Sequence, residues 1–426
     1  MQGTDERRHG RSAGVGMAAM SHRDGVGVPG PGGGAGTSAS GGSFRARQGR
    51  EASRAATAWV LLAAGMGTRM KSSLPKVLHP LCGRPLGSFA LETARRWQPA
   101  QVVVVTGHEA EQVEAELGRW ARRMGMAVTF ARQQPQLGTG HAVLQALPHL
   151  APSVDEVVVS YADTPLVSEG TLQRLCERRR AAGAELAMLT ALLDDPHGYG
   201  RVIRAPGEPE RVTSVVEERD ATPEQRAIRE INAGVYAFAR PALERALAAL
   251  RPDNAQHEYY LTDAVGLLAA SPAGGVVAVP VEDPQEILGV NDRRQLHQME
   301  ALLRGAARGR LMASGVTFAG DPPCVVDPWV EVGRDSVLHA GAWLLGETRL
   351  GERCWIGPGA VLIDCQLEDD VVVEGTMLVE CRVGKGARVG AGAWIAPRGT
   401  RIRAGARVGA VAFPDAGGYP RGGGRA

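Results

Sequence analysis

The sequence contains very few lysines. Of its 48 lysine and arginine residues, only Lys71, Lys76 and Lys385 are lysines, and the other 45 are arginines. Two of these lysines follow closely on a glycine turn at residues 65–67. In a chain that otherwise uses arginine, a lysine favours a site that needs a compact point charge rather than a planar guanidinium. Chance placement is the alternative, so the lysines only support other evidence.

Long apolar segments and paired cysteines are also absent from the sequence. No apolar run approaches the roughly 18 residues that a membrane helix needs. The net charge of +2 favours neither nucleic acid nor an anionic membrane surface as a partner. The six cysteines form no CxxC pair, which argues against a zinc site or a disulfide framework. We therefore expect a cytoplasmic globular protein with no nucleic-acid or membrane partner.

Composition and periodicity divide the chain into five expected segments. A chain of 426 residues is too long for one ordinary core. Fourteen of the 56 glycines lie in the first 50 residues, and such a stretch cannot bury enough apolar surface to become ordered. The expected segments are a disordered tail at 1–57, an α/β domain at 58–292, a connecting helix at 293–315, a repeat domain at 316–409 and a second disordered tail at 410–426.

The α/β segment begins with an apolar run that ends in a glycine turn. Residues 59–76, WVLLAAGMGTRMKSSLPK, predict a strand over 60–64, then a turn at Gly65 and Gly67, then three cations: Arg69, Lys71 and Lys76. Glycines let backbone N–H groups approach phosphates closely, and the cations can neutralise a polyphosphate. This pattern favours a nucleoside triphosphate site. The glycines alone match neither the P-loop nor the dinucleotide spacing, so a purely structural turn is their alternative explanation.

Apolar strands alternate with helical patterns up to about residue 290, which is typical of βα units and a mostly parallel sheet. Further strands are predicted at 101–106, 128–131 and 157–160, and helices at 86–96 and 109–123. Ligands of such sheets bind beyond the carboxyl ends of the strands, where Gly65, Gly107 and Asp163 all fall. A carboxylate there is suited to Mg2+, which prefers oxygen ligands. Capping of the next element is the alternative role for Asp163.

A second glycine-flanked turn, QLGTGHA at 136–142, opens another predicted helix. Its backbone amides and the Thr139 hydroxyl are suited to lining a ligand. An ordinary helix N-cap at Thr139 is the competing explanation.

These motifs together resemble a known enzyme family. LAAGMGTRMKSSLPKVLHPLCGRPL, at 62–86, resembles the signature of sugar-phosphate nucleotidylyltransferases. The motifs QLGTGHA, YADTPL, DDPHGYGRV, VVEERDA, EINAGVY, NAQHEYYLTD and GVNDRRQL are similar to one branch, and they span roughly residues 58–300 in that family's order. That branch is the uridylyltransferase half of the bifunctional N-acetylglucosamine-1-phosphate uridylyltransferase/glucosamine-1-phosphate acetyltransferase family. The resemblance implies a Rossmann-like nucleotidylyltransferase domain.

The implied reaction joins UTP and N-acetylglucosamine 1-phosphate into UDP-N-acetylglucosamine, with release of pyrophosphate, for cell-wall precursor synthesis. In-line attack of the sugar phosphate on the α-phosphorus needs no protein nucleophile. It needs positioning and charge neutralisation, which Mg2+ and basic side chains supply. The residue types of the chain agree with that chemistry.

The resemblance also implies roles for individual residues, carried over by motif position. The uridine and its ribose would contact the end of the first strand: Leu62, Ala63, Ala64 and Gly65. The uracil would be read by Gln133, Gly138 and Thr139. Two catalytic cations would hold the phosphates: Arg69 and Lys76. The sugar would contact Gly200, Glu217 and Asn232. The magnesium ligands would be Asp163 and Asn291.

Two positions of the α/β segment depart from the family pattern. Ala162 and His257 stand where the family usually has glycine. A methyl group beside Asp163 is expected to crowd the sugar or the nucleotide, which leaves the choice of sugar phosphate open.

After residue 315 the apolar pattern changes to a period of six. The helical spacing of 293–313 predicts one long connecting helix before it. Seven apolar residues are then six positions apart: Val326, Val332, Leu338, Leu344, Leu350, Ile356 and Leu362. A second register is predicted after an interruption: Val371, Met377, Val383, Val389 and Ile395. The pattern predicts a left-handed parallel β-helix of hexapeptide repeats, and the resemblance implies a homotrimer.

The second half of the family acetylates glucosamine 1-phosphate with acetyl-CoA, and the chain departs from it. Trp394 or Ala396 occupies the position of the family's sugar-binding arginine, and Arg398 is displaced from it. No histidine follows His339, so a general base of that kind is not supplied. We therefore expect a truncated acetyltransferase half without activity. The alternatives are a nucleotidylyltransferase for another sugar 1-phosphate, such as glucose 1-phosphate, and an inactive regulatory or scaffolding paralogue.

Overall fold

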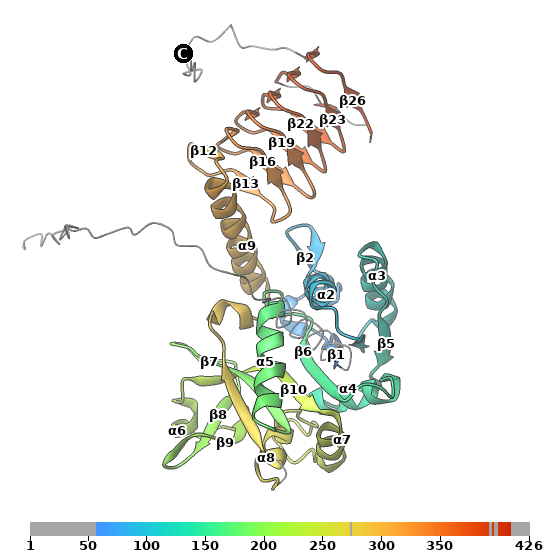
Figure 1. Ribbon diagram of the computed structural model, residues 1–426, viewed down its shortest axis with the longest axis vertical. Coiled ribbons are helices and arrows are strands. Elements are labelled where there is room, and N and C mark those ends of the chain that lie inside the picture. Colours follow the sequence, from blue (N-terminus) through green and yellow to red (C-terminus); the bar gives the residue numbers. More distant parts are fainter. Residues whose placement is uncertain (1–56, 273–274, 392–393, 396–398, 410–426) are drawn as a thin grey trace, which may run out of the picture. The chain divides into compact units, whose positions relative to one another are not determined.

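The computed structural model describes residues 57–272, 275–391, 394–395 and 399–409. An α/β domain is followed by one long helix and a parallel β-helix (Figure 1), which confirms the predicted fold class. The expected disordered tails lie outside the described residues, apart from Thr57. Among the helices of the described ranges, none is both long and apolar enough to span a lipid bilayer.

A nine-stranded sheet forms the centre of the α/β domain. Its strands lie side by side in this order: β11 (Val276–Pro280), β7 (Leu186–Leu192), β10 (Glu230–Ala239), β6 (Glu156–Tyr161), β1 (Thr57–Leu62), β4 (Gln101–Thr106) and β5 (Thr129–Arg132). β8 (Arg201–Ala205) and β9 (Glu208–Val216) extend the sheet beside β10. β10 runs antiparallel to both β6 and β7, so the sheet is mixed rather than purely parallel. β1 also starts and ends earlier than the predicted 60–64, and Ala63 and Ala64 lie beyond it.

Helices cover both faces of the sheet. One face carries α2 (Leu86–Trp97), α3 (Ala110–Arg123) and α5 (Glu169–Ala181), and the other carries α4 (Thr139–Ala146), α7 (Arg240–Ala249) and α8 (Asp263–Ala269). Successive strand residues point to opposite faces, so Trp59 and Leu61 lie in the first core and Val60 and Leu62 in the second. Burial on both faces explains why the apolar run in β1 is unbroken.

The remaining elements of this domain are short. They are α6 (Pro223–Arg226), the hairpin of β2 (Pro80–Leu81) and β3 (Arg84–Pro85), and the 3-10 turns η1 (Thr68–Met70), η2 (Lys76–Leu78), η3 (Leu147–His149) and η4 (Pro284–Ile287). The predicted connecting helix is present as α9 (Arg293–Ala313). Met299 of α9 packs in a small core with Leu81, Cys82, Leu86 and Val290. This core seats the helix on the β2–β3 hairpin.

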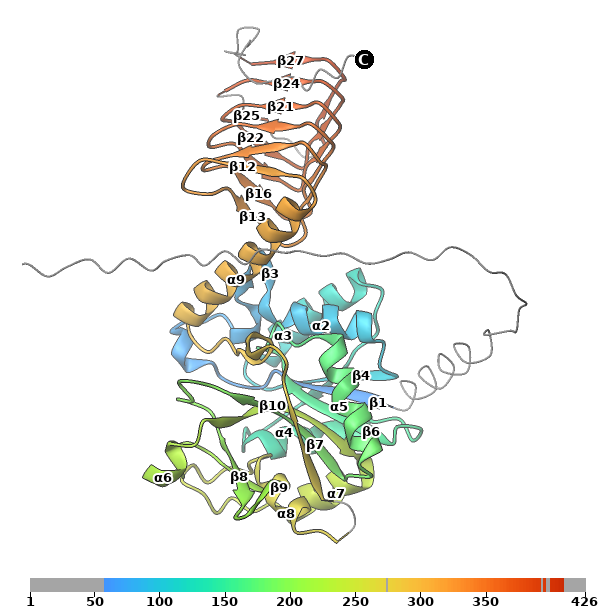
Figure 2. The same cartoon turned by 60° about the vertical axis from the view of Figure 1, so that its left-hand side comes forward.

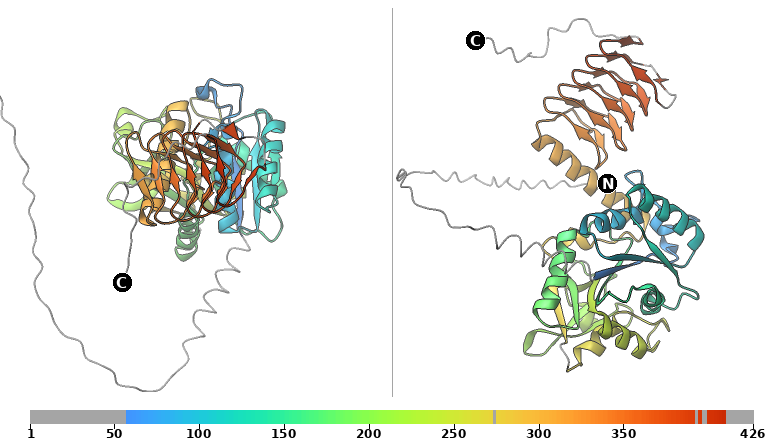
Figure 3. Two further views of the ribbon diagram at one scale, coloured as in Figure 1. Left: turned by 90° about the horizontal axis from the view of Figure 1, so that it is seen from above. Right: turned by 45° about the vertical axis from the view of Figure 1, so that its right-hand side comes forward.

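Three ladders of short parallel strands form the β-helix (Figures 2 and 3). The first contains β12 (Thr317–Ala319), β15 (Val337–His339), β18 (Trp355–Ile356), β21 (Val372–Val373), β24 (Arg388–Val389) and β27 (Arg407–Val408). The second contains β13 (Val325–Val326), β16 (Trp343–Leu345), β19 (Val361–Ile363), β22 (Met377–Val379) and β25 (Trp394–Ile395). The third contains β14 (Glu331–Val332), β17 (Arg349–Leu350), β20 (Gln366–Leu367), β23 (Arg382–Val383) and β26 (Arg401–Ile402).

The first hexapeptide register is confirmed. In the second register Val371, Val383 and Val389 lie in the core, and only Met377 among the side chains that the structure describes is wrong. All seven residues of the first register lie in or against the β-helix core. In the next coil Val373 pairs with Ile356 and Leu378 pairs with Leu362, so these two are its inward-facing strand residues. Met377 instead points outward, with 38% of its surface exposed. The coil after Leu362 is shorter, because Leu362 pairs with Leu378, 16 residues on, whereas Leu344 pairs with Leu362, 18 residues on; strict counting in sixes therefore loses the register there.

The two neighbouring residues of β22 provide a test of this register. We expect Leu378→Ala to lower the free energy of unfolding by about 2–5 kcal/mol, because it opens a cavity in the core. Met377→Ala should lower it by clearly less than Leu378→Ala, because the Met377 side chain lies outside the core of the coil. Denaturant unfolding of both variants measures the difference. The opposite order would support the period-six register instead.

Candidate active site

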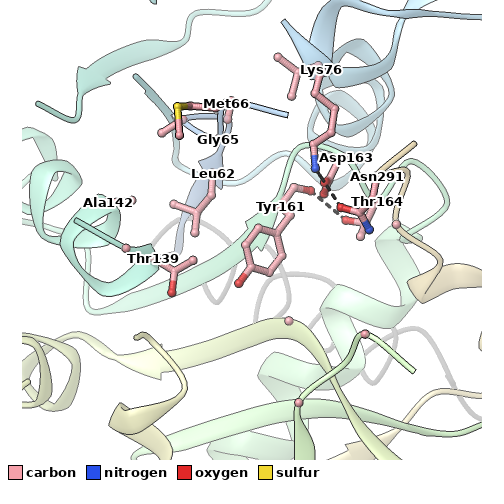
Figure 4. Close-up of a pocket in the computed structure, with 18 of the residues that line it drawn as sticks. Leu62, Gly65, Met66, Lys76, Thr139, Ala142, Tyr161, Asp163, Thr164 and Asn291 are labelled. Atoms are coloured by element: carbon pink, nitrogen blue, oxygen red, sulfur yellow. Dashed lines mark hydrogen bonds and ion pairs between the residues drawn. The ribbon is translucent and has the colours of Figure 1, made fainter. Parts of the chain in front are cut away.

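A cavity of about 510 Å³ lies at the carboxyl ends of β1 and β6 (Figure 4). Every site residue predicted from the sequence lines it. They are Leu62, Ala63, Ala64, Gly65, Arg69, Lys76, Gln133, Gly138, Thr139, Asp163, Gly200, Glu217, Asn232 and Asn291. They come from segments far apart in the chain, and the sheet brings these segments to one edge. The role of each residue in binding or catalysis stays a prediction.

The two glycines of the turn after β1 have different surroundings. Gly67 has a φ of 60°, and a Cβ on it would lie 2.7 Å from the Cβ of Lys76. Glycine is therefore needed there both for the left-handed backbone and for the close approach of Lys76. At Gly65 a Cβ would meet no atom within 4 Å. The backbone at Gly65 is thus open to a ligand rather than covered by protein.

Two cations and two oxygen-bearing side chains meet beside this turn. Lys76 Nζ forms an ion pair with Asp163 Oδ2 and lies 3.2 Å from Asn291 Oδ1 (Figure 4). Arg69 Nη2 donates to the same Asn291 oxygen, also at 3.2 Å. The Asp163 and Asn291 oxygens thus orient both cations. Basic side chains held in place at an open turn are suited to binding a polyphosphate.

Asp163 and Asn291 suit a magnesium ion as partial ligands. Their oxygens already share one cation, the Lys76 ammonium group, so the two atoms lie close enough to act together. Within the described ranges, no group of three or more His, Cys, Asp or Glu side chains could hold a metal alone. Mg2+ commonly binds through one or two protein oxygens together with substrate phosphates and water. The donor set therefore fits Mg2+ that arrives with a phosphate ligand.

Another wall of the cavity is built around Gln133 and α4. The Gln133 amide nitrogen donates to Gly138 O at 2.8 Å and lies 3.1 Å from His141 Nδ1. Gly138, with a φ of 102°, is the N-cap of α4, so the N-cap alternative for Thr139 is wrong. The Thr139 hydroxyl instead accepts a hydrogen bond from Leu261 N at 3.0 Å. A Cβ on Gly138 would lie 2.7 Å from Tyr259 O, so this tight approach also requires glycine.

A third wall carries Glu217, Asn232 and two glycines. A Cβ on Gly200 would lie 3.5 Å from Glu217 Oε2, and Gly200 O accepts a hydrogen bond from Asn232 N at 2.9 Å. Burial raises the pKa of the Glu217 carboxyl, while the hydroxyl of Thr262 donates to it at 3.1 Å. The Asn232 side chain accepts from Gly234 N at 3.1 Å. These contacts hold a carboxyl and an amide at the cavity surface.

The structure adds residues that the sequence analysis did not assign. Tyr161, the last residue of β6, lies against Gly234, where a Cβ would come within 2.5 Å of its ring. Gln136 Nε2 donates to Ala64 O at 2.6 Å, and a Cβ on Gly107 would lie 2.6 Å from that same nitrogen. Both Tyr161 and Gln136 belong to motifs that the sequence shows, YADTPL and QLGTGHA. Nothing in those motifs indicates which side chains face the ligand.

Ala162 does not crowd the cavity, so that expectation is wrong. Its backbone N–H donates to Leu62 O at 3.0 Å, and its methyl group is buried in the core that contains Trp59 and Leu61. It is absent from the residues that line the cavity. The methyl of Ala162 thus lies in the core, whereas Asp163 lines the cavity. His257, the other departure, is exposed and has a φ of 56°.

Glycine substitutions at these two positions should have opposite effects on stability. Ala162→Gly removes a buried methyl group and should lower the free energy of unfolding by about 1 kcal/mol. His257→Gly relieves a left-handed backbone at a side-chain-bearing residue and should raise it by about 1 kcal/mol. Denaturant unfolding of both variants against the parent measures the two signs. A stabilising effect of Ala162→Gly would contradict the buried placement of its methyl.

The acetyltransferase expectation concerns residues that the structure describes only in part. Trp394 belongs to β25, but its side chain, together with Ala396 and Arg398, lies outside the described residues. The β-helix itself is present up to β27. The described part of the β-helix therefore gives no support to a loss of acetyl transfer.

Comparison with known proteins identifies the family. Residues 59–259 match the family of the MobA-like NTP transferase domain. The chain is 42% identical over 325 residues to the bifunctional protein GlmU of Heliobacterium modesticaldum, across 76% of this chain and 69% of that protein. It is 45% identical over 327 residues to the GlmU of Syntrophotalea carbinolica, across 76% and 68%. Against the GlmU of Trichlorobacter lovleyi, the identity is 42% over 332 residues, across 78% and 70%. The chain therefore belongs to the GlmU family and is a sugar nucleotidylyltransferase.

Proposed function

We propose that this protein transfers the uridylyl group of UTP to N-acetylglucosamine 1-phosphate. The products are UDP-N-acetylglucosamine and pyrophosphate, and the nucleotide sugar serves cell-wall precursor synthesis. The observation that carries the proposal is the meeting of Arg69, Lys76, Asp163 and Asn291 beside the open turn at Gly65. The same cavity is also lined by the Gln133 side-chain amide and by the Glu217 carboxyl.

The Gln133 side chain supports uracil as the base of the nucleotide. The Gln133 nitrogen is already used by Gly138 O and His141, while its oxygen has no donor among the described residues. An amide oxygen accepts a hydrogen bond but cannot donate one. Uracil carries an N3–H donor, whereas the corresponding nitrogen of cytosine is an acceptor. Gln133 would therefore accept from uracil and leave cytosine unpaired, which is costly for a buried polar group.

The cations support the transfer step. An oxygen of the sugar phosphate bonds to the α-phosphorus of UTP, and the bond from that phosphorus to the bridging oxygen breaks. Pyrophosphate leaves with the bridging oxygen and its electron pair. Arg69 and Lys76 would hold the phosphates in line and offset the charge on the leaving group. Asp163 and Asn291 would hold Mg2+, which when bound supplies further charge neutralisation.

The third wall would bind the sugar. The Glu217 carboxyl accepts from Thr262 and has capacity for further donors, such as sugar hydroxyls. Asn232 and the backbone at Gly200 lie beside it. Since the Ala162 methyl does not enter the cavity, it gives no reason to prefer another sugar phosphate.

A homotrimer formed through the β-helix is part of the proposal. The outward face of the second ladder is apolar and contains Trp343, Val361 and Met377 in register. The Trp343 side chain is 44% exposed, which is unusual for so large an apolar group in a row of others. The third ladder instead presents Glu331 and Arg349 outward. Of these two ladders, the second is therefore the face that we expect copies of the chain to cover.

Loss of acetyl transfer stays a prediction of the sequence. Incubation of the purified protein with acetyl-CoA and glucosamine 1-phosphate would show directly whether that reaction occurs.

Pyrophosphate release tests the main proposal. We expect release from UTP with N-acetylglucosamine 1-phosphate, loss of release with EDTA, and about a 100-fold lower rate in Asp163→Asn, because the neutral amide binds a cation less well. Asp155→Asn, at the exposed residue before β6, is the matched control and should behave as the parent. Release with glucose 1-phosphate alone would favour the other-sugar alternative. No release with any sugar phosphate would favour the inactive paralogue.

Gln133 provides a test of base selection. Gln133→Ala should raise the KM for UTP about tenfold and reduce the preference for UTP over CTP, because it removes the acceptor for the uracil N3–H. Gln173→Ala on α5, outside the cavity, is the control. Steady-state kinetics with both nucleotides measure the change. An unchanged UTP-to-CTP preference would remove Gln133 from base recognition.

A further inference from the structure

The first turn of α9 contacts the proposed phosphate site at two points. Arg293 Nε donates a hydrogen bond to Met70 O at 3.1 Å. Gln295 Oε1 accepts one from the backbone N–H of Asn291 at 2.7 Å. Neither residue lines the cavity, so neither is expected to touch a ligand. Each of them instead contacts a segment that carries a cavity residue.

The Arg293 contact holds the turn that carries Arg69. Met70 is the last residue of η1, and a carbonyl at a helix end has no partner within the helix. The residues that flank η1, Gly67 and Lys71, both have left-handed backbones, with φ of 60° and 48°. Such a turn has little regular structure to stabilise it. A charged donor on its terminal carbonyl therefore restricts where the Arg69 side chain can lie.

The Gln295 contact holds Asn291 against the two cations. Asp292 caps α9 by accepting from Arg294 N at 2.9 Å and Gln295 N at 2.8 Å. This cap fixes the helix start, and Gln295 then reaches back to the N–H of Asn291. The Asn291 Oδ1 atom accepts from both cations at 3.2 Å. The first turn of α9 therefore helps to position both residues of the Arg69–Asn291 contact.

Arg293 is also a positive charge without a counter-charge in the part of the chain that the structure describes. No salt bridge of Arg293 is found there. His79 lies near it, and burial together with the Arg293 charge lowers the pKa of that imidazole, which favours the neutral form. The field of Arg293 thus adds to that of Arg69 and Lys76 around η1.

We infer that Arg293 and Gln295 are positioning residues for uridylyl transfer, so that the first turn of the connecting helix orients Arg69 and Asn291 toward UTP. The inference rests on the proposed function for the identity of the nucleotide. Met299 seats the same helix in the core with Leu81 and Val290. The order of the phosphate site therefore depends on the helix that leads to the β-helix.

Variants of Arg293 test the inference. Arg293→Met keeps a long stem and removes the donor, Arg293→Lys keeps one charged donor, and Arg294→Met is the matched control on an exposed neighbour. We expect Arg293→Met to lower kcat/KM for UTP about tenfold, the effect of one charge-assisted hydrogen bond. The KM for N-acetylglucosamine 1-phosphate should stay within about twofold, and Arg293→Lys should recover most of the loss.

Equilibrium binding of UTP, measured by calorimetry, gives a readout that does not depend on turnover. Arg293→Met should bind UTP more weakly than Arg294→Met, with a thermal midpoint within about 2 °C of the parent. Equal UTP binding by the two variants would overturn the inference. A parallel rise of both KM values with a lower thermal midpoint would also overturn it, because the role would then be structural. If the parent releases no pyrophosphate, the proposed function fails, and the binding comparison still decides the inference.

Discussion

The contact of Lys76 with Asp163 and Asn291 is the interaction on which the site depends. The two partners are 87 and 215 residues away along the chain, so the contact joins η2, which packs against Gly67 of the glycine turn, to the turn after β6 and the segment before α9. Two cations side by side repel each other unless oxygens lie between them. Asp163 and Asn291 supply these oxygens, and the phosphates of a nucleotide would offer more. Lys76 begins η2, Asp163 lies in the turn after β6, and Asn291 directly precedes the N-cap of α9.

Much of this arrangement was predictable because the signals are local. The strand at 101–106 and the helix at 293–313 follow from short apolar patterns, and parallel strands necessarily bring their carboxyl ends to one edge. Gly65, Gly107 and Asp163 are therefore placed at one edge of the sheet by the sequence pattern alone. The seven residues from Val326 to Leu362 stay in phase for a similar reason, since each coil repeats with the same length.

The rest depended on tertiary packing, which a linear pattern does not contain. The side on which the Ala162 methyl lies is decided by the core around Trp59, not by its neighbour Asp163. The outward position of Met377 follows from coils that shorten at their corners, where no apolar residue marks the change. The reversal of β10 and the packing of Tyr161 against Gly234 arise from strands that meet only in the folded sheet.

The start of α9 shows how these two kinds of information combine. The sequence predicts a long connecting helix, and such a helix needs only length and an apolar stripe to link two domains. Its first turn also contacts the site. Asp292 caps the helix start, and from there Gln295 accepts a hydrogen bond from the N–H of Asn291 while Arg293 donates one to the carbonyl of Met70. A shift of the helix start by even one residue would turn these side chains about 100° around the axis and break both contacts. The start of the connecting helix is thus tied by hydrogen bonds to the proposed phosphate site as well as linking the two domains.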